Sequence, residues 1–468
     1  MRLFEILALA SILPFILWPL LRLPRYRQLK ALPIVSLLFL LLHLFIEKYR
    51  WQMVPAYGIT GFILVVELWK WRAGSSGVEK RWLTNLSTFL GIGVFLLAAA
   101  LPALMPVPKL PHPTGPFAIG TASYHLVDSS RPEFYTDDPD DSREFMMQVW
   151  YPTVPGEGDG QAEYIDRLDI AGPAFATWLE LPAFLLDHIN LTKTDAVKGV
   201  PVLDSDAPYP IIFFSHGLHG FRSQNISNIQ ELVSQGYVLV SIDHTYANMI
   251  SVFPEDRITF YSPEIFSDEP LDPPRNANTL LKVWAGDFGF ALDQLTAWNR
   301  QVGNLYYQQL DPAAVGFFGH STGGGAAVEF CAQDSRCQAG IGLDSWIEPV
   351  SEDIIADGLR QPFMFLSSEE WLGEENSALG RALYNHLDSS GYILTLKDTK
   401  HFDFSDLTLL SPLTPQLDLT GSINGPYSIG IQNEYILAFF DKHLKRANIQ
   451  LLSQPSAYPE LQVEWNGK

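Results

Sequence analysis

The chain has 468 residues, of which 47% are hydrophobic, and a formal net charge of −21. Single domains usually stop growing near about 250–300 residues, so two structural regions are expected. Residues 1–110 contain 12 Lys and Arg against 4 Asp and Glu, whereas residues 111–468 carry a net charge of −29. Because an acidic surface repels phosphate backbones, the composition argues against nucleic-acid binding.

Four apolar runs open the chain, at residues 3–21, 31–46, 53–69 and 82–105. Each approaches the roughly 17–25 residues with which a helix crosses a bilayer. A cleaved signal peptide is the alternative for the first run, but its N-terminal region has only Arg2, balanced by Glu5, and three more runs follow. We therefore predict an anchor of about four transmembrane helices at residues 1–106, through which the protein is held in a membrane.

Basic residues in the short connections predict the orientation of these helices. The connections after the first and third runs carry Arg22, Arg25, Arg27, Lys30, Lys70, Arg72, Lys80 and Arg81. The connection between the second and third runs offers only Lys48 and Arg50. We therefore expect both termini and the domain that follows to be extracytoplasmic, in a bacterial-type cell membrane. His43 and Glu67 lie near the ends of apolar runs, where snorkelling to the interface is expected.

Residues 107–116 are rich in proline, which forbids helix continuation and favours an extended linker. From residue 117 to residue 468, β-rich runs alternate with helical stretches, which predicts one catalytic domain with a mostly parallel, doubly wound α/β sheet. The expected strands are 145–151, 211–214, 237–243, 313–318, the run that ends before Asp344, 363–366 and 392–396, and the expected helices are 223–235, 279–300 and 429–446. In such sheets, the chemistry gathers at the carboxyl ends of the strands.

The motif Gly319-His320-Ser321-Thr322-Gly323 lies between an expected strand and an Ala/Gly-rich helix. This G-x-S-x-G pattern is typical of the nucleophile elbow of α/β-hydrolases, in which flanking glycines make room for a tight strand-to-helix turn. The start of the helix favours negative charge on a developing oxyanion. Ser321 is therefore the predicted nucleophile of an α/β-hydrolase fold.

A serine hydroxyl needs a base, which follows the nucleophile in the usual chain order. Among the later histidines, only His401 follows a strand directly, whereas His386 and His443 lie in polar helical patterns. The acid has three candidates, because Asp344 closes one strand and Glu369 and Glu370 close the next. The pattern of residues alone leaves these alternatives open.

An oxyanion hole takes one backbone N–H from the residue after the nucleophile and one from a loop after an earlier strand. Thr322 and Leu218 are the expected donors. His216 precedes the serine and is expected to order the loop that carries Leu218.

Cys331 and Cys337 are the two cysteines of the chain and lie six positions apart. They are a possible disulfide if this domain lies outside the cytoplasm, and otherwise two small apolar residues. No Cys or His spacing typical of a zinc site is present. We therefore expect no metal and no cofactor.

The chain resembles the platelet-activating factor acetylhydrolase family, monomeric type II class, including its bacterial relatives, from about Gly115 to Leu444. The resemblance rests on Val149-Trp150-Tyr151-Pro152, Phe214-Ser215-His216-Gly217-Leu218, Gly319-His320-Ser321-Thr322-Gly323-Gly324, Leu343-Asp344-Ser345-Trp346 and His401-Phe402-Asp403-Phe404-Ser405-Asp406. Family members keep their acid in a Leu-Asp-x-Trp setting, so the resemblance favours Asp344 and also implies Leu218 and Thr322 as oxyanion donors. It further implies hydrolysis of short or oxidised sn-2 acyl chains of phospholipids without a metal.

The resemblance is weak over about 160–200. That segment holds an apolar stripe of Trp178, Leu179, Leu181, Phe184, Leu185, Leu186 and Ile189, for which we weigh a lid or bilayer-contacting wall against ordinary core. The expected function is a membrane-tethered serine esterase acting on a lipid ester through an acyl-enzyme. The alternatives are a general carboxylesterase or polyester hydrolase, and a membrane protein in which the fold only binds a ligand.

Overall fold

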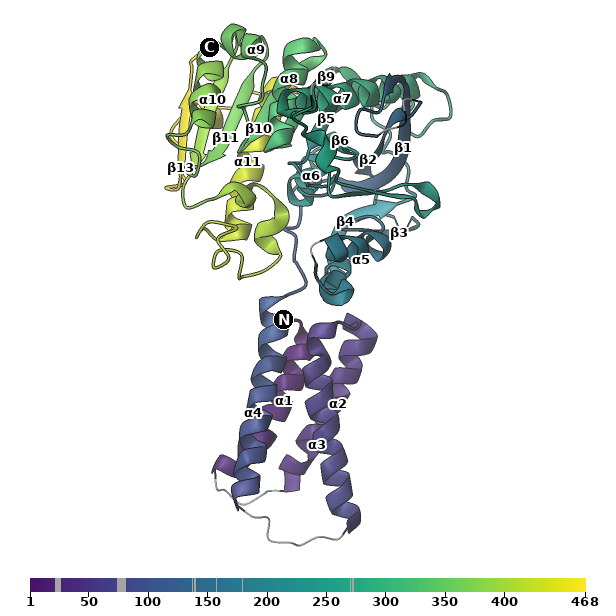
Figure 1. Ribbon diagram of the computed structural model, residues 1–468, viewed down its shortest axis with the longest axis vertical. Helices are drawn as coiled ribbons and strands as arrows, with labels where there is room; N and C mark the ends of the chain where they lie inside the picture. Colours follow the sequence, from purple (N-terminus) through teal and green to yellow (C-terminus); the bar gives the residue numbers. More distant parts are fainter. Residues whose placement is uncertain are drawn as a thin grey trace. The chain divides into compact units, whose positions relative to one another are not determined.

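The computed structural model describes residues 1–21, 27–73, 81–136, 138, 140–156, 158–178, 180–269, 271 and 273–468. It divides into two compact units, coloured along the sequence in Figure 1. The helical unit comprises Met1–Pro108, Ala176–Thr192 and Leu410–Leu413, and the sheet unit comprises Lys109–Phe175, Lys193–Leu409 and Thr414–Lys468. Arg22, Arg25 and Lys80, on which the expected orientation partly rests, lie outside the described residues.

The helical unit contains α1 (Leu3–Leu21), α2 (Leu32–Leu42), α3 (Val54–Ala73) and α4 (Arg81–Leu104). A π-helical turn over His43–Glu47 continues α2. α1 packs against α2 and α4, and α3 packs against α2 and α4. Within the described residues, four segments are long and apolar enough to cross a membrane, namely Leu3–Leu20, Gln28–Glu47, Trp51–Ala73 and Thr84–Leu104. They coincide with the four apolar runs of the sequence.

A cluster of charged side chains joins segments of the helical unit that are distant in sequence. Arg50 Nε donates to Glu5 Oε1 over 2.8 Å, and Arg2 Nε donates to the same oxygen over 2.8 Å. His43 Nδ1 lies 3.1 Å from Glu47 Oε2. The prediction that His43 snorkels is wrong, because its ring is fully buried in this cluster. Burial of such groups is tolerated because each faces a partner of suitable charge or hydrogen-bonding capacity.

Two segments from beyond the linker, Ala176–Thr192 and Leu410–Leu413, belong to the helical unit. A 3₁₀ segment, Ala183–Leu191, lies beside the start of α3, where Trp51 Nε1 donates to Leu185 O over 3.1 Å. The Trp51 ring also meets the Phe184 ring edge to face at 5.2 Å. Of the apolar stripe predicted from the sequence, the structure describes the side chains from Leu181 to Ile189. The Trp178 side chain and Leu179 lie outside the described residues.

The sheet unit is built on eleven strands in the order β13-β12-β11-β10-β9-β5-β6-β2-β1-β4-β3. The strands are β1 (Ala118–Pro132), β2 (Ser142–Thr153), β3 (Gly160–Glu163), β4 (Lys193–Lys198), β5 (Tyr209–Ser215), β6 (Val238–Asp243), β9 (Leu310–His320), β10 (Cys337–Leu343), β11 (Phe363–Ser368), β12 (Gly391–Leu396) and β13 (Leu461–Trp465). The six strands from β12 to β6 run parallel, and β13 and β2 flank them antiparallel. β7 (Ile250–Val252) and β8 (Ile258–Phe260) form a separate hairpin.

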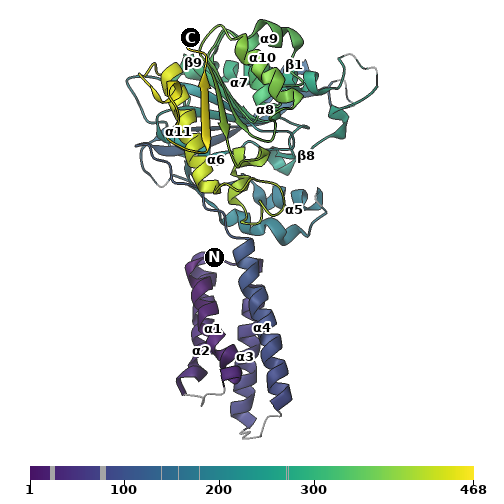
Figure 2. The ribbon, with the colours of Figure 1, turned by 90° about the vertical axis from the view of Figure 1, so that its left-hand side faces the viewer.

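Helices cover both faces of this sheet. The helices after the linker are α5 (Leu168–Trp178), α6 (Ile226–Ser234), α7 (Ala277–Arg300), α8 (Thr322–Gln333), α9 (Glu352–Asp357), α10 (Glu375–Asn385) and α11 (Gly425–His443), and the last three residues of α5 belong to the helical unit. Consecutive residues of a strand point to opposite faces. On β9, the Phe317 ring lies 5.4 Å from Phe288 of α7, whereas the Phe318 ring lies 6.2 Å from Phe440 of α11. Figure 2 shows α7 and α8 on one side of the sheet and α6 and α11 on the other.

The parallel strands end side by side at one edge of the sheet. Ser215 at the end of β5 pairs with Gly319 of β9, and His320 of β9 pairs with Leu343 of β10. Because the six strands share one direction, the loops that follow them meet at this edge. Ser321 and Asp344 directly follow β9 and β10 there, as the alternation of strands and helices predicts.

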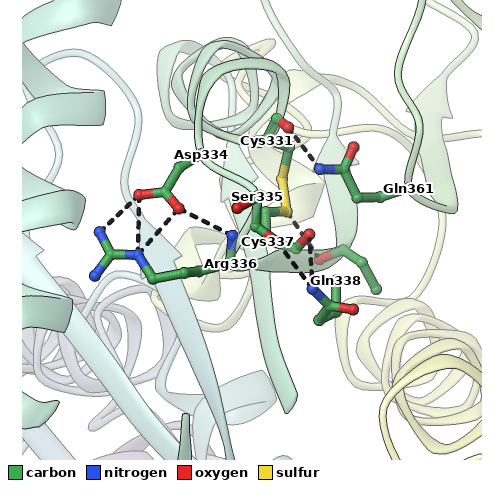
Figure 3. Close-up of a disulfide and its surroundings, with 8 residues drawn as sticks. Cys331, Asp334, Ser335, Arg336, Cys337, Gln338 and Gln361 are labelled. Carbon is green, nitrogen blue, oxygen red and sulfur yellow. Dashed lines mark hydrogen bonds and ion pairs between the residues drawn. A yellow bond between two sulfur atoms is a disulfide. The ribbon is translucent and has the colours of Figure 1, made fainter. Parts of the chain in front are cut away.

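The two cysteines form a disulfide in the structure. Cys331 lies at the end of α8 and Cys337 begins β10, with their Cα atoms 5.1 Å apart (Figure 3). Gln361 Nε2 donates to Cys331 O over 2.7 Å, and Asp334 in the connecting loop binds the Arg336 guanidinium. The disulfide therefore closes the short turn between the helix after Ser321 and the next strand.

Candidate active site

Ser321 sits at a sharp turn between β9 and α8. Its backbone has φ 56° and ψ −120°, a left-handed conformation that costs free energy and is typical of a nucleophile elbow. Two hydrogen bonds connect this turn to the end of β10 and the loop after it. Ser321 N donates to Leu343 O and Trp346 N donates to Ser321 O, each over 3.0 Å. A Cβ on Gly323 would lie 2.3 Å from Ser215 O, so the motif requires glycine at that position.

Asp344 and His401 meet at the same edge of the sheet. His401 Nδ1 lies 2.7 Å from Asp344 Oδ2. The carboxylate is fully buried and has two further donors, Ser368 N to Oδ1 at 2.8 Å and Trp371 Nε1 to Oδ2 at 2.7 Å. With Nδ1 donating to a carboxylate, the other ring nitrogen of His401 is free to accept a proton. The His401 side chain is 21% exposed, so this ring can reach a bound molecule.

The pKa of Asp344 reflects two opposing influences. Burial alone raises the pKa of this carboxyl group, but the hydrogen bond and charge of His401, together with the donors from Ser368 and Trp371, outweigh it. The pKa therefore lies below its usual value. Asp344 is thus a carboxylate at neutral pH and can orient and stabilise a charged imidazole.

The two other acids weighed from the sequence contact backbone rather than the imidazole. Glu370 Oε2 accepts from His401 N over 2.9 Å, and Glu369 Oε2 accepts from Asp398 N over 3.3 Å. Glu370 therefore holds the loop that carries His401. His386 and His443 make their hydrogen bonds elsewhere, with Ile355 O and the Tyr392 hydroxyl.

His320, the residue before Ser321, ties the elbow to the His401 loop. Its Nε2 lies 3.0 Å from His401 O, and Gln224 Nε2 lies 2.9 Å from its Nδ1. Since a carbonyl can only accept and an amide NH₂ can only donate, His320 carries its proton on Nε2. Burial, and next the nearby His401, lower the pKa of His320 to about 3, which keeps the ring neutral. Sequence reasoning gave this variable position of the motif no role.

The loop after β5 lies against the nucleophile. A Cβ on Gly217 would come within 3.1 Å of both Ser321 Cβ and His320 Nδ1, which is closer than an ordinary van der Waals contact. Leu218 follows directly and is half-buried. Thr322 is the first residue of α8, where backbone N–H groups have no partner inside the helix. Leu218 therefore follows the glycine that lies against Ser321, and Thr322 follows Ser321 directly.

A second serine–histidine–aspartate arrangement lies behind that loop. Ser215 Oγ is 3.0 Å from His244 Nε2, and His244 Nδ1 is 2.8 Å from Asp287 Oδ2. All three residues are fully buried. Sequence reasoning missed this group, although His244 directly follows β6 at the same edge, a position that is typical of functional residues.

The chain is similar to proteins of one known family. A family model described as "Platelet-activating factor acetylhydrolase, isoform II" matches residues 105–259 and 292–458. The chain is 26% identical over 268 residues to a platelet-activating factor acetylhydrolase of Gallus gallus, which covers 50% of this chain and 62% of that protein. A protein of the same name from Cavia porcellus is 25% identical over 366 residues, or 72% of this chain and 78% of that protein.

Two further relatives carry other names. A "Probable 1-alkyl-2-acetylglycerophosphocholine esterase" of Arthroderma benhamiae is 25% identical over 54% of this chain and 64% of that protein. Among solved structures, a ferulic acid esterase from Streptomyces cinnamoneus matches with a TM-score of 0.62 and 25% identity, covering 76% of this chain and 99% of that one. The match spans less than two thirds of the avian and fungal relatives.

Proposed function

Because this chain belongs to the family of platelet-activating factor acetylhydrolase, isoform II, a family of carboxylic ester hydrolases, we propose that it is a serine esterase. Ser321 is the proposed nucleophile, His401 the base and Asp344 the acid that orients it. The observation that carries this proposal is the 2.7 Å contact between His401 Nδ1 and Asp344 Oδ2, formed beside the strained turn of Ser321.

The proposed reaction has two acyl-transfer steps. His401 Nε2 takes the Ser321 hydroxyl proton as Oγ attacks the ester carbonyl carbon, and the carbonyl oxygen becomes an oxyanion that the Leu218 and Thr322 N–H groups bind. His401 then gives the proton to the leaving alkoxide, so an alcohol departs and the acyl-enzyme remains. Water, deprotonated by His401, attacks the acyl carbon and releases the carboxylic acid and Ser321. Every group comes from this chain, so hydrolysis is expected to persist in EDTA.

The proposed substrates are phospholipids with a short or oxidised sn-2 acyl chain. The names of the animal and fungal relatives support this class, since they refer to platelet-activating factor and to an acetylated glycerophosphocholine. The likeness to a ferulic acid esterase favours a second candidate, a carboxylesterase on non-phospholipid esters. Rates measured on phosphatidylcholines of increasing sn-2 length, beside p-nitrophenyl acetate, separate the two. A preference for phospholipid with a sharp cut-off in chain length supports the first, and hydrolysis of simple esters alone supports the second.

The helical unit is the proposed membrane tether. Four segments have the length and apolar character to span a bilayer, and the basic connections support an extracytoplasmic sheet unit. The disulfide between Cys331 and Cys337 agrees with an oxidising compartment. Trypsin added to intact cells tests this orientation. Cleavage of the sheet unit is expected, and protection until the cells are opened would contradict it.

The nucleophile assignment is tested by labelling with a fluorophosphonate probe. The unmodified protein is expected to be labelled, and Ser321→Ala is expected to remain folded but to lose both labelling and ester hydrolysis. Ser215→Ala is the matched control, because its hydroxyl group is fully buried and should not be the labelled one. Persistent labelling of Ser321→Ala would refute the assignment.

A further inference from the structure

The orientation of the Leu218 N–H is determined by the carbonyl group of the residue before it. Gly217 C=O and Leu218 N–H belong to one planar peptide unit, in which they point in opposite directions. Gly217 O accepts from Gly220 N over 2.8 Å and faces His216 Nδ1 at 2.6 Å. These two contacts hold the carbonyl on one side of the loop. The Leu218 N–H therefore points to the other side.

The hydrogen bonds of His216 specify which of its nitrogens carries the proton. The backbone N–H of His244 donates to His216 Nε2 over 3.3 Å, so Nε2 accepts and Nδ1 carries the hydrogen. His216 Nδ1–H can then donate to Gly217 O. Complete burial of the ring lowers the pKa of His216, which keeps it in this neutral form.

His244 is itself held by a buried chain of charged groups. Asp287 binds the Arg143 guanidinium through both oxygens, Nε to Oδ1 at 3.0 Å and Nη2 to Oδ2 at 2.7 Å. Burial raises the pKa of Asp287, but the charges of Arg143 and Arg131 outweigh it and lower the pKa overall. An ionised Asp287 accepts from His244 Nδ1–H, which leaves His244 Nε2 to accept from the Ser215 hydroxyl.

The Trp284 ring completes the enclosure of this network. It stacks on the His244 ring at 4.1 Å with an angle of 7° between the planes, and it meets the His216 ring at 5.0 Å. Ser215, His216 and His244 are fully buried, so no substrate reaches them. Ser215 and His216 are consecutive residues at the start of the loop after β5. Each of them makes a hydrogen bond with His244.

We propose that His216 is a positioning residue that aims the Leu218 N–H at the oxyanion, and that Ser215, His244 and Asp287 form the buried frame that holds His216. This inference rests on the proposed function, in which the Leu218 amide binds the oxyanion. His216 acts through the backbone of Leu218 and touches no reacting atom. Its loss should therefore affect the transition state more than substrate binding.

A pair of amide substitutions in the full-length, detergent-solubilised protein tests the proposal. The Nδ2 group of asparagine lies where histidine has Nδ1, so His216→Asn retains a donor to Gly217 O, whereas the amide of His216→Gln lies farther out. For p-nitrophenyl acetate, His216→Gln should lose about 100- to 1000-fold in kcat, with KM nearly unchanged. His216→Asn should regain about tenfold or more of this loss.

A trifluoromethyl ketone inhibitor gives the readout that separates positioning from a general structural role. Ser321 Oγ adds to its carbonyl carbon, and the carbonyl oxygen becomes an oxyanion in the same hole. The inhibition constant of His216→Gln should rise in parallel with the fall in kcat/KM. Equal activity of the Gln and Asn variants, a change in KM alone, or an unchanged inhibition constant would each overturn the proposal.

Two controls keep the test decisive. If His216→Gln cannot be recovered folded, Ser215→Ala removes only the hydroxyl group that donates to His244 Nε2, and kcat should still fall by about tenfold with the same change in inhibition. An unchanged kcat in that variant would overturn the proposal. Fluorophosphonate labelling of the unmodified protein is measured first. A failure to label would refute the proposed function. Normal labelling, together with His216 variants whose kcat and inhibition constant are unchanged, would refute only this inference.

Discussion

Two serine–histidine–aspartate arrangements lie at the same edge of one sheet and differ in exposure. In the first, His401 Nδ1 is 2.7 Å from Asp344, the imidazole is 21% exposed and Ser321 is half-buried. We call this the open arrangement. In the second, His244 Nδ1 is 2.8 Å from Asp287, and both residues and Ser215 are fully buried. We call this the sealed arrangement.

The two His–Asp distances are nearly equal, so exposure and backbone geometry are what distinguish the two arrangements. In the sealed arrangement, burial, ahead of all other influences, lowers the pKa of His244 to about 3, so its imidazole stays neutral and serves as a fixed hydrogen-bonding group. In the open arrangement, the serine sits in a strained turn and the histidine reaches solvent. These properties are those that the proposed reaction requires of its nucleophile and base.

The largest expected effect comes from removing each carboxylate in turn. Asp344→Asn should lower kcat by about 10⁴-fold while the protein stays folded, because the imidazole loses its orienting anion. Asp287→Asn should cost about 3–5 kcal/mol of stability, because it leaves the buried Arg143 without its bidentate partner, and should lower kcat far less than Asp344→Asn does. Steady-state kinetics and chemical unfolding measure the two effects.

Glu370→Gln is the matched control for this pair, since Glu370 contacts only the backbone of His401 among the groups of the open arrangement. Its kcat should stay close to that of the unmodified protein. If Glu370→Gln lost most of its kcat while Asp344→Asn stayed active, Glu370 and not Asp344 would be the acid that orients His401.

A smaller effect is expected at His320, where the amide preference should be the reverse of that at His216. Glutamine places its Nε2 group where His320 has Nε2–H, so His320→Gln can still donate to His401 O, whereas His320→Asn cannot. His320→Asn should lower kcat by about 10- to 100-fold through displacement of His401, and His320→Gln should lose less. Kinetics on p-nitrophenyl acetate measure this difference. Equal losses in both variants would show that His320 does not hold His401 through this bond.

The next effect concerns how a lipid reaches the open arrangement. Leu181 and Phe184 are 38% and 49% exposed and belong to the segment Ala176–Thr192, which is part of the helical unit. If this segment contacts lipid, Leu181→Ser with Phe184→Ser should slow hydrolysis of vesicle-borne phospholipid by about tenfold and leave p-nitrophenyl acetate hydrolysis unchanged. Val302→Ser, at a 79% exposed site of the sheet unit, is the control. Equal losses on both substrates would reject lipid contact.

The smallest effect is a pH dependence of stability from Asp406. This carboxyl group is fully buried, and burial raises its pKa to about 7, although the Ser227 and Tyr164 hydrogen bonds lower it. The unfolded chain has a carboxyl pKa of about 3.9, so between roughly pH 4 and 7 the folded protein binds more protons. Stability should therefore fall as pH rises through this window.

Asp406→Asn removes this titration and should flatten the dependence by a few degrees in the thermal midpoint. Thermal unfolding at pH 5, 6 and 7 measures it. A stability of the unmodified protein that rises from pH 5 to 7 relative to Asp406→Asn would contradict the expected sign.

Local sequence was sufficient for several features of this protein. Each of three features depends only on residues that are neighbours in sequence, because hydrophobic periodicity and turn-forming residues are local properties. These features are the four apolar runs, the parallel strands from β5 to β12 and the Gly319–Gly323 elbow. The pattern of residues did not separate Asp344 from Glu369 and Glu370, since all three follow strands. In the structure, only Asp344 among them contacts the imidazole of His401.

Tertiary structure decided what depends on contacts between distant residues. Ser215, His244 and Asp287 come from β5, the end of β6 and the middle of α7, and no spacing along the chain joins them. The same holds for the hydrogen bond between Trp51 and Leu185, which belongs to the segment Ala176–Thr192 that is grouped with the helical unit. The sequence specifies the type of each side chain and how apolar and polar residues alternate along the chain. The order of strands in the sheet and the direction of each side chain decide which of them meet, and whether water or substrate can reach them.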